Sequence, residues 1–311
     1  MQRAPGTHEK TEQELEHEVE AKIYTIAQWL GLALLGACTT EAIALIVHGQ
    51  GSNGKSVLLD MISELFGGDR VATLAPQKMR ERFSRQQLLG CALNCVSEMP
   101  ESDLLDSSTL KAIISGDRIE CEFKHLDAFT FKPRAAHVFS ANHLPASRDR
   151  SHGLWRRLLP VEFTHIFTDD EKDRDMINKL KAEFDLIVPR ALDCAREYYI
   201  ERRFKYIKEI NAWRWIWRRQ VDHVALYVEE RLQPTSSARE GAALKEIWED
   251  FTQWATDTGA SGAAKMSLIA FGRQVAQLPT IEKGRYGKQR TTRINQKLKT
   301  NTDVNAWQTT H

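Results

Sequence analysis

The residues with the clearest chemistry lie in one short stretch, Gly49-Gln50-Gly51-Ser52-Asn53-Gly54-Lys55-Ser56. It fits the pattern G-x-x-x-x-G-K-[ST] in full. The glycines let the backbone curl so that its N–H groups point inward at phosphate oxygens, and the start of a following helix adds partial positive charge. Lys55 is expected to reach the β- and γ-phosphates, and Ser56 to bind Mg²⁺. The stretch therefore predicts a site for a nucleoside triphosphate, with ATP and Mg²⁺ as the expected ligands.

Such a loop works only between a buried strand and an amphipathic helix. Ala42–Val47 is a continuous apolar run, as expected for a strand buried on both faces of a parallel sheet. Ser56–Phe66 has apolar residues at helical spacing and is closed by two glycines. Ala92–Val96 and Ala135–Ser140 are two further strand candidates, each ending in polar residues. Ligands of open parallel sheets bind at that edge, so the sequence predicts the site there.

Taken together, the motifs resemble those of superfamily 3 helicases, most closely the carboxy-terminal helicase part of phage, plasmid and poxvirus primase-helicases. The resemblance begins at Gly51-x-Asn53-Gly54-Lys55-Ser56, because an Asn before Gly-Lys-Ser is common in that group, and continues to about Phe163. It implies an α/β fold with an AAA+-type P-loop ATPase core. In that group the core hydrolyses ATP between the subunits of a ring, a hexamer, and moves single-stranded DNA.

The resemblance implies further catalytic residues. Leu93-Asn94-Cys95-Val96 leads into Ser97-Glu98, where the family has a pair of acids. Since Ser97 replaces the first acid, Glu98 is the expected catalytic carboxylate and Mg²⁺ ligand, with Glu101 or ordered water as possible assistants. Val138-Phe139-Ser140-Ala141 ends at Asn142, the expected sensor of the γ-phosphate or the attacking water. An amide suits that task because it both donates and accepts hydrogen bonds.

Two more segments match the family in order. Gly153-Leu154-Trp155-Arg156-Arg157-Leu158 resembles its arginine-finger segment, in which an arginine enters the ATP site of the neighbouring subunit. Arg157 is favoured by position and Arg156 is the alternative. Ile119–Phe123 and Ala128–Phe131 alternate around Lys124-His125, which predicts a hairpin. Related helicases carry a Lys-His pair at the tip of a DNA-contacting hairpin, so Lys124 and His125 are expected to contact the DNA backbone.

Charge is unevenly distributed along a chain of 311 residues whose net charge is only +1. Residues 9–20 carry six Glu and one Lys, whereas residues 265–299 carry nine Lys or Arg and one acid. The basic region follows two expected helices, at Leu244–Trp254 and Met266–Gln277, and looks like a winged-helix module. We expect DNA contacts there at Lys283, Arg285, Lys288 and Arg290.

The predicted organisation has four parts: a helical segment over residues 1–40, the ATPase core over 41–168, a helical extension over 169–233 and a winged-helix-like domain over 242–303. In the helical extension, Trp213–Arg219 interleaves Trp and Arg; we interpret it as a helix with at least one buried Trp rather than a base-stacking surface. About 40 residues precede the first strand, so we expect no primase domain within this chain. A primase or other replication proteins are possible partners.

Composition favours a soluble protein. Its apolar fraction of 42% supports an ordinary core, and no apolar run approaches the ~20 residues of a membrane helix. Five cysteines lack CxxC spacing, so we expect neither a disulfide framework nor a zinc site. A reduced, cytoplasmic protein is then the expectation, and the absence of a long apolar run predicts no membrane partner. The predicted function is an ATP-dependent DNA helicase acting on single-stranded or forked DNA. Two alternatives remain: an ATP-gated DNA-binding initiator or loader, and a small-molecule P-loop kinase.

Overall fold

The computed structural model describes residues 11–99, 107–142, 152–276, 278, 281–286 and 291–299. Contacts divide the chain into two compact units with a break after Trp217. The first unit contains an acid-rich first helix, whose amino end is a capping box. The Thr11 hydroxyl accepts from the Glu14 N–H at 3.3 Å, and the Glu14 carboxylate accepts from the Thr11 N–H at 2.8 Å. This helix, α1, spans Glu12–Leu34.

A five-stranded parallel sheet forms the centre of the first unit. Its strands are β1 (Ala44–His48), β2 (Val71–Ala72), β3 (Leu93–Val96), β6 (Ala136–Ala141) and β7 (Leu158–Glu162), in the spatial order β2-β3-β6-β1-β7. All neighbouring pairs run parallel. The predicted strands around β1, β3 and β6 are confirmed, and β3 and β6 are buried along their whole length, including the polar residues Asn94, His137 and Ser140.

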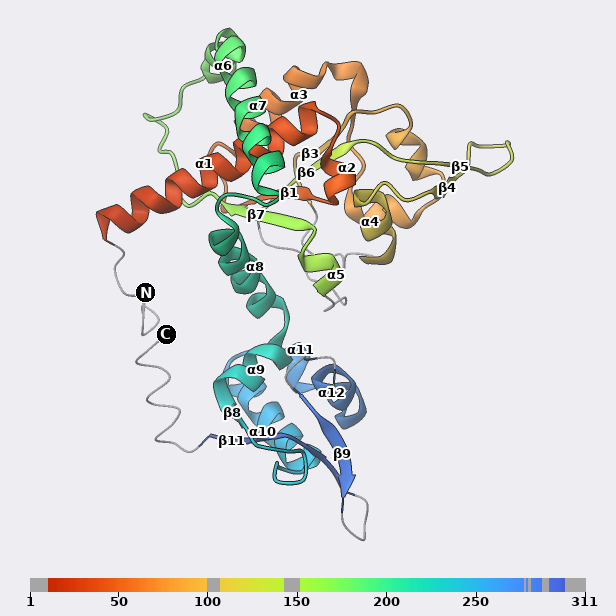
Figure 1. Ribbon diagram of the computed structural model, residues 1–311, viewed down its shortest axis with the longest axis vertical. Coiled ribbons are helices and arrows are strands. Elements are labelled where there is room, and N and C mark those ends of the chain that lie inside the picture. The colour runs from red at the N-terminus through yellow and green to blue at the C-terminus, as the bar shows by residue number, and fades with distance from the viewer. Residues whose placement is uncertain are drawn as a thin grey trace. The chain divides into compact units, whose positions relative to one another are not determined.

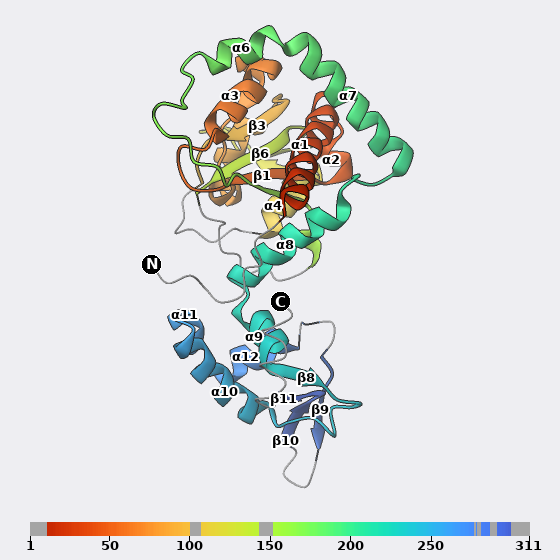
Figure 2. The same ribbon diagram turned by 90° about the vertical axis from the view of Figure 1, so that its left-hand side faces the viewer.

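Helices cover both faces of this sheet. Helix α3 (Lys55–Phe66) lies on one face and α1 on the other, where α7 (Phe184–Glu201) runs beside α1 (Figure 2). Figure 1 shows the same layers from the front. The remaining helices of this unit are α2 (Cys38–Glu41), α4 (Ser107–Ile114), α5 (His152–Trp155), α6 (Met176–Ala182) and α8 (Ile207–Val221), the last of which continues past the break. Short 3₁₀ turns lie at Gly68–Arg70, Pro76–Arg80 and Ser84–Leu88.

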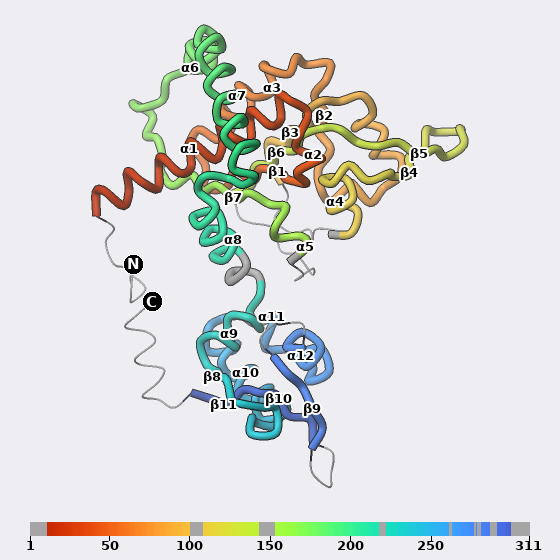
Figure 3. The backbone as a smooth tube through the Cα atoms, viewed as in Figure 1, coloured from red at the N-terminus to blue at the C-terminus, as the bar shows by residue number. Residues whose placement is uncertain are grey.

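An antiparallel hairpin of β4 (Ile119–Cys121) and β5 (Phe129–Phe131) confirms the predicted alternation. Its connecting loop extends away from the five-stranded sheet (Figure 3). The expectation for the tryptophan-rich helix is also confirmed, because Trp217 is fully buried and meets Trp155 edge to face.

The second unit has its own apolar core, formed by residues such as Tyr227, Ile247, Phe251, Phe271 and Ile294. Its helices are α9 (His223–Arg231), α10 (Leu244–Asp257), α11 (Ser261–Ala264) and α12 (Leu268–Val275). Its strands are β8 (Leu232–Pro234), β9 (Lys283–Tyr286), β10 (Thr291–Ile294) and β11 (Gln296–Leu298), paired antiparallel as β9 with β10 and β8 with β11. Contacts thus group α9 and β8 with this unit.

In the part of the chain that the structure describes, no helix is both long and apolar enough to cross a bilayer.

Candidate nucleotide site

The stretch from Gly49 to Ser56 links the end of β1 to the start of α3. Its backbone turns through positive φ angles at Gly49 (142°), Ser52 (60°) and Gly54 (84°). Glycine is required at Gly49, because a Cβ there would lie 2.2 Å from the carbonyl oxygen of Phe163. At Gly51 nothing lies within 4 Å of the position a Cβ would take. The backbone of Gly51 is therefore open to an incoming ligand, as a phosphate-binding loop needs.

Lys55 is buried within this loop. Its ammonium group donates to the Gly49 carbonyl at 2.6 Å, the Gln50 carbonyl at 3.1 Å and Oδ1 of Asn53 at 2.9 Å. Burial lowers the pKa of Lys55, and the negative charge of Glu98 opposes that shift. The loop is thus folded around a positive charge that has only neutral oxygen partners there, an arrangement that favours an anion.

Asn53 holds the loop against the segment that follows β7. Its Nδ2 donates to the carbonyl of Phe163 at 3.0 Å, while its Oδ1 accepts from Lys55. The sequence assigned Asn53 to ligand binding. The structure gives its side chain a second task, because both ends of the amide are occupied by protein groups.

Glu98 and Asn142 lie at the carboxyl ends of neighbouring strands. Val96 of β3 pairs with Phe139 of β6, so the chain leaves both strands at the same edge. Nδ2 of Asn142 donates to Oε1 of Glu98 at 3.3 Å. The side chains of Ser97 and Glu98 are exposed at this edge. Two of the predicted catalytic residues are therefore in direct contact.

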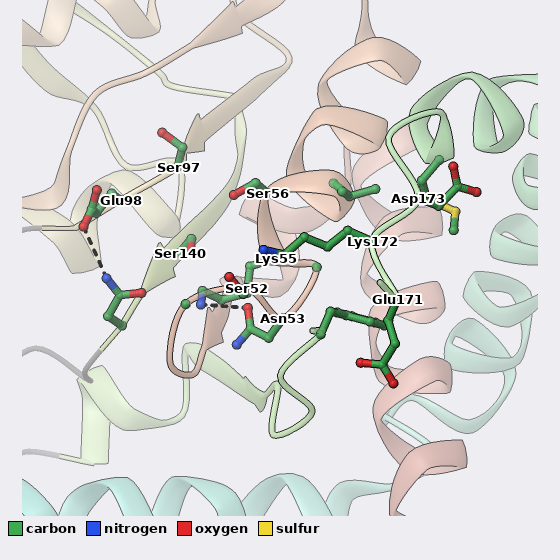
Figure 4. A pocket seen from close by; sticks show the side chains of 16 residues that line it. Ser52, Asn53, Lys55, Ser56, Ser97, Glu98, Ser140, Glu171, Lys172 and Asp173 are labelled. Atoms are coloured by element: carbon green, nitrogen blue, oxygen red, sulfur yellow. Dashed lines mark hydrogen bonds between the residues drawn. The ribbon is translucent and has the colours of Figure 1, made fainter. Parts of the chain in front are cut away.

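One pocket of about 440 Å³ unites these groups. It is lined by Gly51, Ser52, Asn53, Gly54, Lys55, Ser56, Val57, Ser97, Glu98, Ser140, Asn142, Phe167, Glu171, Lys172, Asp173 and Met176. Ser97 and Glu98 lie on one side of Lys55 and Ser56, and Glu171, Lys172 and Asp173 lie on the other (Figure 4). Its volume is in the range of about 300–1,000 Å³ typical of small-molecule sites. Glu101, named above as a possible assistant, lies outside the described residues.

Sequence reasoning missed the last five of these residues. They follow β7 directly, and its carboxyl end lies at the same edge as those of β1 and β6. Nothing in their types or spacing indicates a ligand. The strand that precedes them, β7, was itself not among the predicted strands, so their position after it carried no signal either.

Arg156 and Arg157 do not line this pocket. The guanidinium of Arg157 donates from Nε to the Ser115 hydroxyl at 2.9 Å and from Nη1 to the Gly153 carbonyl. Burial lowers the pKa of Arg157, and neighbouring Arg156 adds to that shift. The side chain of Arg156 is exposed, whereas its carbonyl accepts from Nη2 of Arg214 at 2.8 Å. The two arginines therefore have different surroundings: the Arg157 side chain is hydrogen-bonded within its own chain, whereas the Arg156 side chain is exposed.

The hairpin residues Lys124 and His125 occupy the turn between β4 and β5, and both side chains are exposed. His125 has a φ of 65°, which sets the tight turn. In the second unit Lys283 and Arg285 are exposed on β9. Lys288 and Arg290 lie outside the described residues.

The phosphate-loop region matches a known protein family that has no assigned role. Residues 47–157 match the family described as "Family of unknown function (DUF5906)". The match covers the loop, the hairpin and the arginine pair.

Two groups of viral proteins are similar over most of the chain. A protein of Acanthamoeba polyphaga mimivirus named "Putative helicase" is 20% identical over 254 residues, 72% of this chain and 26% of the viral protein. A "Putative primase" of African swine fever virus is 22% identical over 268 residues, 78% of this chain and 27% of that protein. This chain is similar to viral helicases and primases. It spans about a quarter of the length of these curated relatives.

Two solved structures are also similar at low identity. An apo structure of the NrS-1 C terminal region has a TM-score of 0.48 and 13% identity, over 94% of this chain and 77% of the other. A JCV helicase structure has a TM-score of 0.30 and 13% identity, over 68% of this chain and 65% of the other.

Proposed function

We propose that this chain is the ATP-hydrolysing motor of a replication helicase of the superfamily 3 type. Its similarity to viral helicases and primases supports a nucleic-acid enzyme of replication. One observation carries the finer proposal: a single pocket contains the phosphate-loop residues Lys55 and Ser56 together with Glu98 and Asn142. A phosphate loop alone suits many enzymes, whereas a hydrolase also needs a carboxylate and a sensor beside it.

The residues of the pocket fit ATP and Mg²⁺. The open space at Gly51 leaves backbone accessible to phosphate oxygens, and Lys55 supplies a buried positive charge. Ser56 and Glu98 line the same pocket and offer the oxygen ligands that Mg²⁺ prefers. Bound there, Mg²⁺ would supply positive charge at the β- and γ-phosphates.

The protein's own residues divide the hydrolysis between them. Glu98 accepts a proton from the attacking water, and Nδ2 of Asn142 fixes the position of the Glu98 carboxylate. Oδ1 of Asn142 remains to orient the water or sense the γ-phosphate. Lys55 stabilises the negative charge that develops on the transferred phosphoryl group, once its contacts to the Gly49 and Gln50 carbonyls exchange for phosphate oxygens.

A ring of subunits would add an arginine from the neighbouring chain. The exposed side chain of Arg156 suits this role better than Arg157, whose guanidinium is bonded to Ser115 and Gly153. In this proposal Arg157 fixes the segment and Arg156 reaches across. Such a finger typically raises turnover by about 10³ to 10⁵.

DNA contact is assigned to two basic surfaces. The exposed turn at Lys124-His125 would meet single-stranded DNA inside the ring, and the second unit, with Lys283, Arg285, Lys288 and Arg290, would act as a winged-helix-like DNA-binding module. Forked DNA is then the substrate, and a primase or other replication proteins are the proposed partners.

The test measures ATP hydrolysis and unwinding of forked DNA by the wild type and the Glu98→Gln variant. We expect single-stranded DNA to stimulate wild-type turnover and Glu98→Gln to abolish it. Glu162→Gln is the matched control, because Glu162 ends β7, another strand of the same sheet, but does not line the pocket. It should keep full activity.

Two outcomes would replace the proposal. ATP-dependent oligomers that bind DNA, with slow turnover that Glu98→Gln leaves unchanged, would indicate a loader or initiator. Turnover that DNA does not stimulate, with phosphoryl transfer to a small molecule, would indicate a kinase.

A further inference from the structure

The pocket extends beyond the phosphate loop onto the segment Phe163–Met176, which follows β7. Three hydrogen bonds fasten this segment to the phosphate loop and to the end of β1. The N–H of Phe163 donates to the His48 carbonyl at 2.7 Å, and Nδ2 of Asn53 donates to the Phe163 carbonyl at 3.0 Å. The N–H of Phe167 donates to the Ser52 carbonyl at 2.7 Å. These bonds fix the position of the segment relative to the phosphate loop. We call Phe163–Met176 the wall of the pocket.

This wall presents apolar side chains to the pocket. Phe167 is 38% exposed and Met176 is 37% exposed, although both line the pocket. The Phe167 ring lies beside Gly54, where a Cβ would be in ordinary van der Waals contact with its Cε2 atom at 3.6 Å. His165 meets the Phe167 ring edge to face, with centroids 4.6 Å apart. An aromatic ring that is supported from one side and open to a pocket is suited to stack on a flat ligand.

The charged residues of the wall have distinct partners. The Glu171 carboxylate accepts from the N–H of Thr168 at 2.8 Å, and Asp173 pairs with Lys179 at 2.5 Å, so both acids hold the segment together. Lys172 pairs with Asp169 at 2.6 Å, and its side chain points from the segment toward the phosphate loop (Figure 4). The positively charged side chain of Lys172 is therefore directed at the phosphate loop, whereas Glu171 and Asp173 stabilise the segment itself.

The order of groups along the pocket gives a direction to the ligand. Glu98 and Asn142, which contact each other, act on the terminal phosphate in the proposed hydrolysis. Glu98 lies on the side of Lys55 opposite to Lys172 (Figure 4). The nucleoside must then point the other way, toward Phe167 and Met176.

We propose that Phe167 and Met176 form the nucleobase subsite of this pocket and that Lys172 contacts the phosphate nearest to the nucleoside. The inference rests on the proposed nucleotide binding and assigns its specificity. Stacking on an aromatic ring accepts any base and strengthens with the size of the base. The site should therefore bind purine nucleotides in preference to pyrimidine nucleotides and discriminate little between ATP and GTP.

The experiment compares ATP with inorganic tripolyphosphate, which has the phosphates but no nucleoside. Dissociation constants are measured by calorimetry with Mg²⁺ for the full chain. Phe167→Ala should weaken ATP binding about tenfold and leave tripolyphosphate binding unchanged. Phe167→Tyr, which keeps the ring, should restore ATP binding. Ile166→Ala is the matched control, because Ile166 is exposed next to Phe167 and does not line the pocket.

A second variant tests the placement of Lys172. Lys172→Gln should weaken ATP and ADP by the same factor, because the phosphate nearest to the nucleoside is common to both. If the variant binds both nucleotides with wild-type affinity, Lys172 does not contact this phosphate and the assignment is wrong.

The outcomes separate this inference from the function it rests on. The nucleobase assignment is wrong, although nucleotide binding stands, in either of two cases. In one, Phe167→Ala binds ATP as tightly as the wild type; in the other, its affinities for ATP and for tripolyphosphate fall by the same factor. If the wild type binds neither ligand, or Lys55→Ala binds both unchanged, the proposed function itself is wrong.

Discussion

The two basic regions assigned to DNA contact use their charges differently. In the β4–β5 hairpin the charges that fix the structure lie at its base. Arg85 donates to the carbonyls of Glu120 at 2.8 Å and of Met79 at 2.7 Å, and Arg82 pairs with Glu120 at 3.1 Å. Lys124 and His125, at the tip, are exposed. Anchoring and binding are thus assigned to different residues.

In the second unit, several basic residues hold the fold together. The Arg231 guanidinium donates two hydrogen bonds, of 2.8 and 3.3 Å, to the Asp250 carboxylate. The same carboxylate accepts from the Tyr227 hydroxyl at 2.8 Å. Arg293 donates to the Gly241 carbonyl at 2.8 Å, and Lys299 donates to the Glu229 carbonyl at 2.6 Å. A count of positive residues in the sequence therefore overstates the surface available to DNA here.

The largest expected effect is on stability, at Asp250. Asp250→Ala leaves the buried Tyr227 hydroxyl and the Arg231 guanidinium without this acceptor, so we expect the second unit to lose about 3 kcal/mol of unfolding free energy. Thermal and urea unfolding measure it. Glu249→Ala, on the exposed face of the same helix, should change stability by less than about 0.5 kcal/mol. Equal stability of the two variants would mean that this network does not hold α9 to α10.

A smaller loss of stability is expected at Arg293. Arg293→Met keeps the apolar part of the side chain but removes the donor to Gly241, which should cost about 2 kcal/mol. The same substitution at Arg285, exposed on the paired strand β9, should leave the unfolding midpoint unchanged. If both variants melt alike, the division of this unit into structural and free basic residues is wrong.

At the hairpin tip we expect the opposite of the two effects above: a change in function without a loss of stability. Lys124→Ala removes a charge that the fold does not use, so the melting temperature should stay constant while DNA-stimulated ATP turnover falls about tenfold. Turnover is measured with and without single-stranded DNA. Lys132→Ala, exposed just beyond β5, is the control and should retain stimulation. Normal stimulation and unwinding by Lys124→Ala would contradict the assignment of the hairpin.

Much of the core fold was predictable because local pattern and tertiary structure agree there. Strands β1, β3 and β6 are rich in apolar residues and lie in the buried centre of the sheet, and the glycines after Phe66 end α3 where the sequence predicts. The placement of Glu98 and Asn142 at the same edge of the sheet followed from the same logic, since both follow parallel strands, whereas their hydrogen bond is a finding of the structure. These predictions needed no knowledge of distant contacts.

The rest depended on contacts between distant parts of the chain. Arg157 was favoured over Arg156 by position alone, but its guanidinium meets Ser115, 42 residues earlier. Phe167 and Lys172 line the pocket only because the segment after β7 is bonded to Ser52 and Asn53. In the same way, nothing in the sequence distinguishes Arg293, which donates a hydrogen bond to the Gly241 carbonyl, from Arg285, which is exposed.

The smallest expected effect is at Arg285, and it tests whether the second unit contacts DNA at all. As an exposed residue on β9, it can pair with a phosphate without reading sequence. Arg285→Ala should weaken DNA binding about threefold for every sequence and lower the slope of log affinity against log salt by about 1. Fluorescence anisotropy across a salt series measures both quantities. Thr291→Ala is the neutral control, because Thr291 is the exposed first residue of β10, the strand that pairs with β9. A variant that has lost a phosphate contact releases fewer counterions when it binds DNA, so its slope is smaller. A slope unchanged by Arg285→Ala but reduced by Lys124→Ala would therefore place the phosphate contact at the hairpin and not at β9.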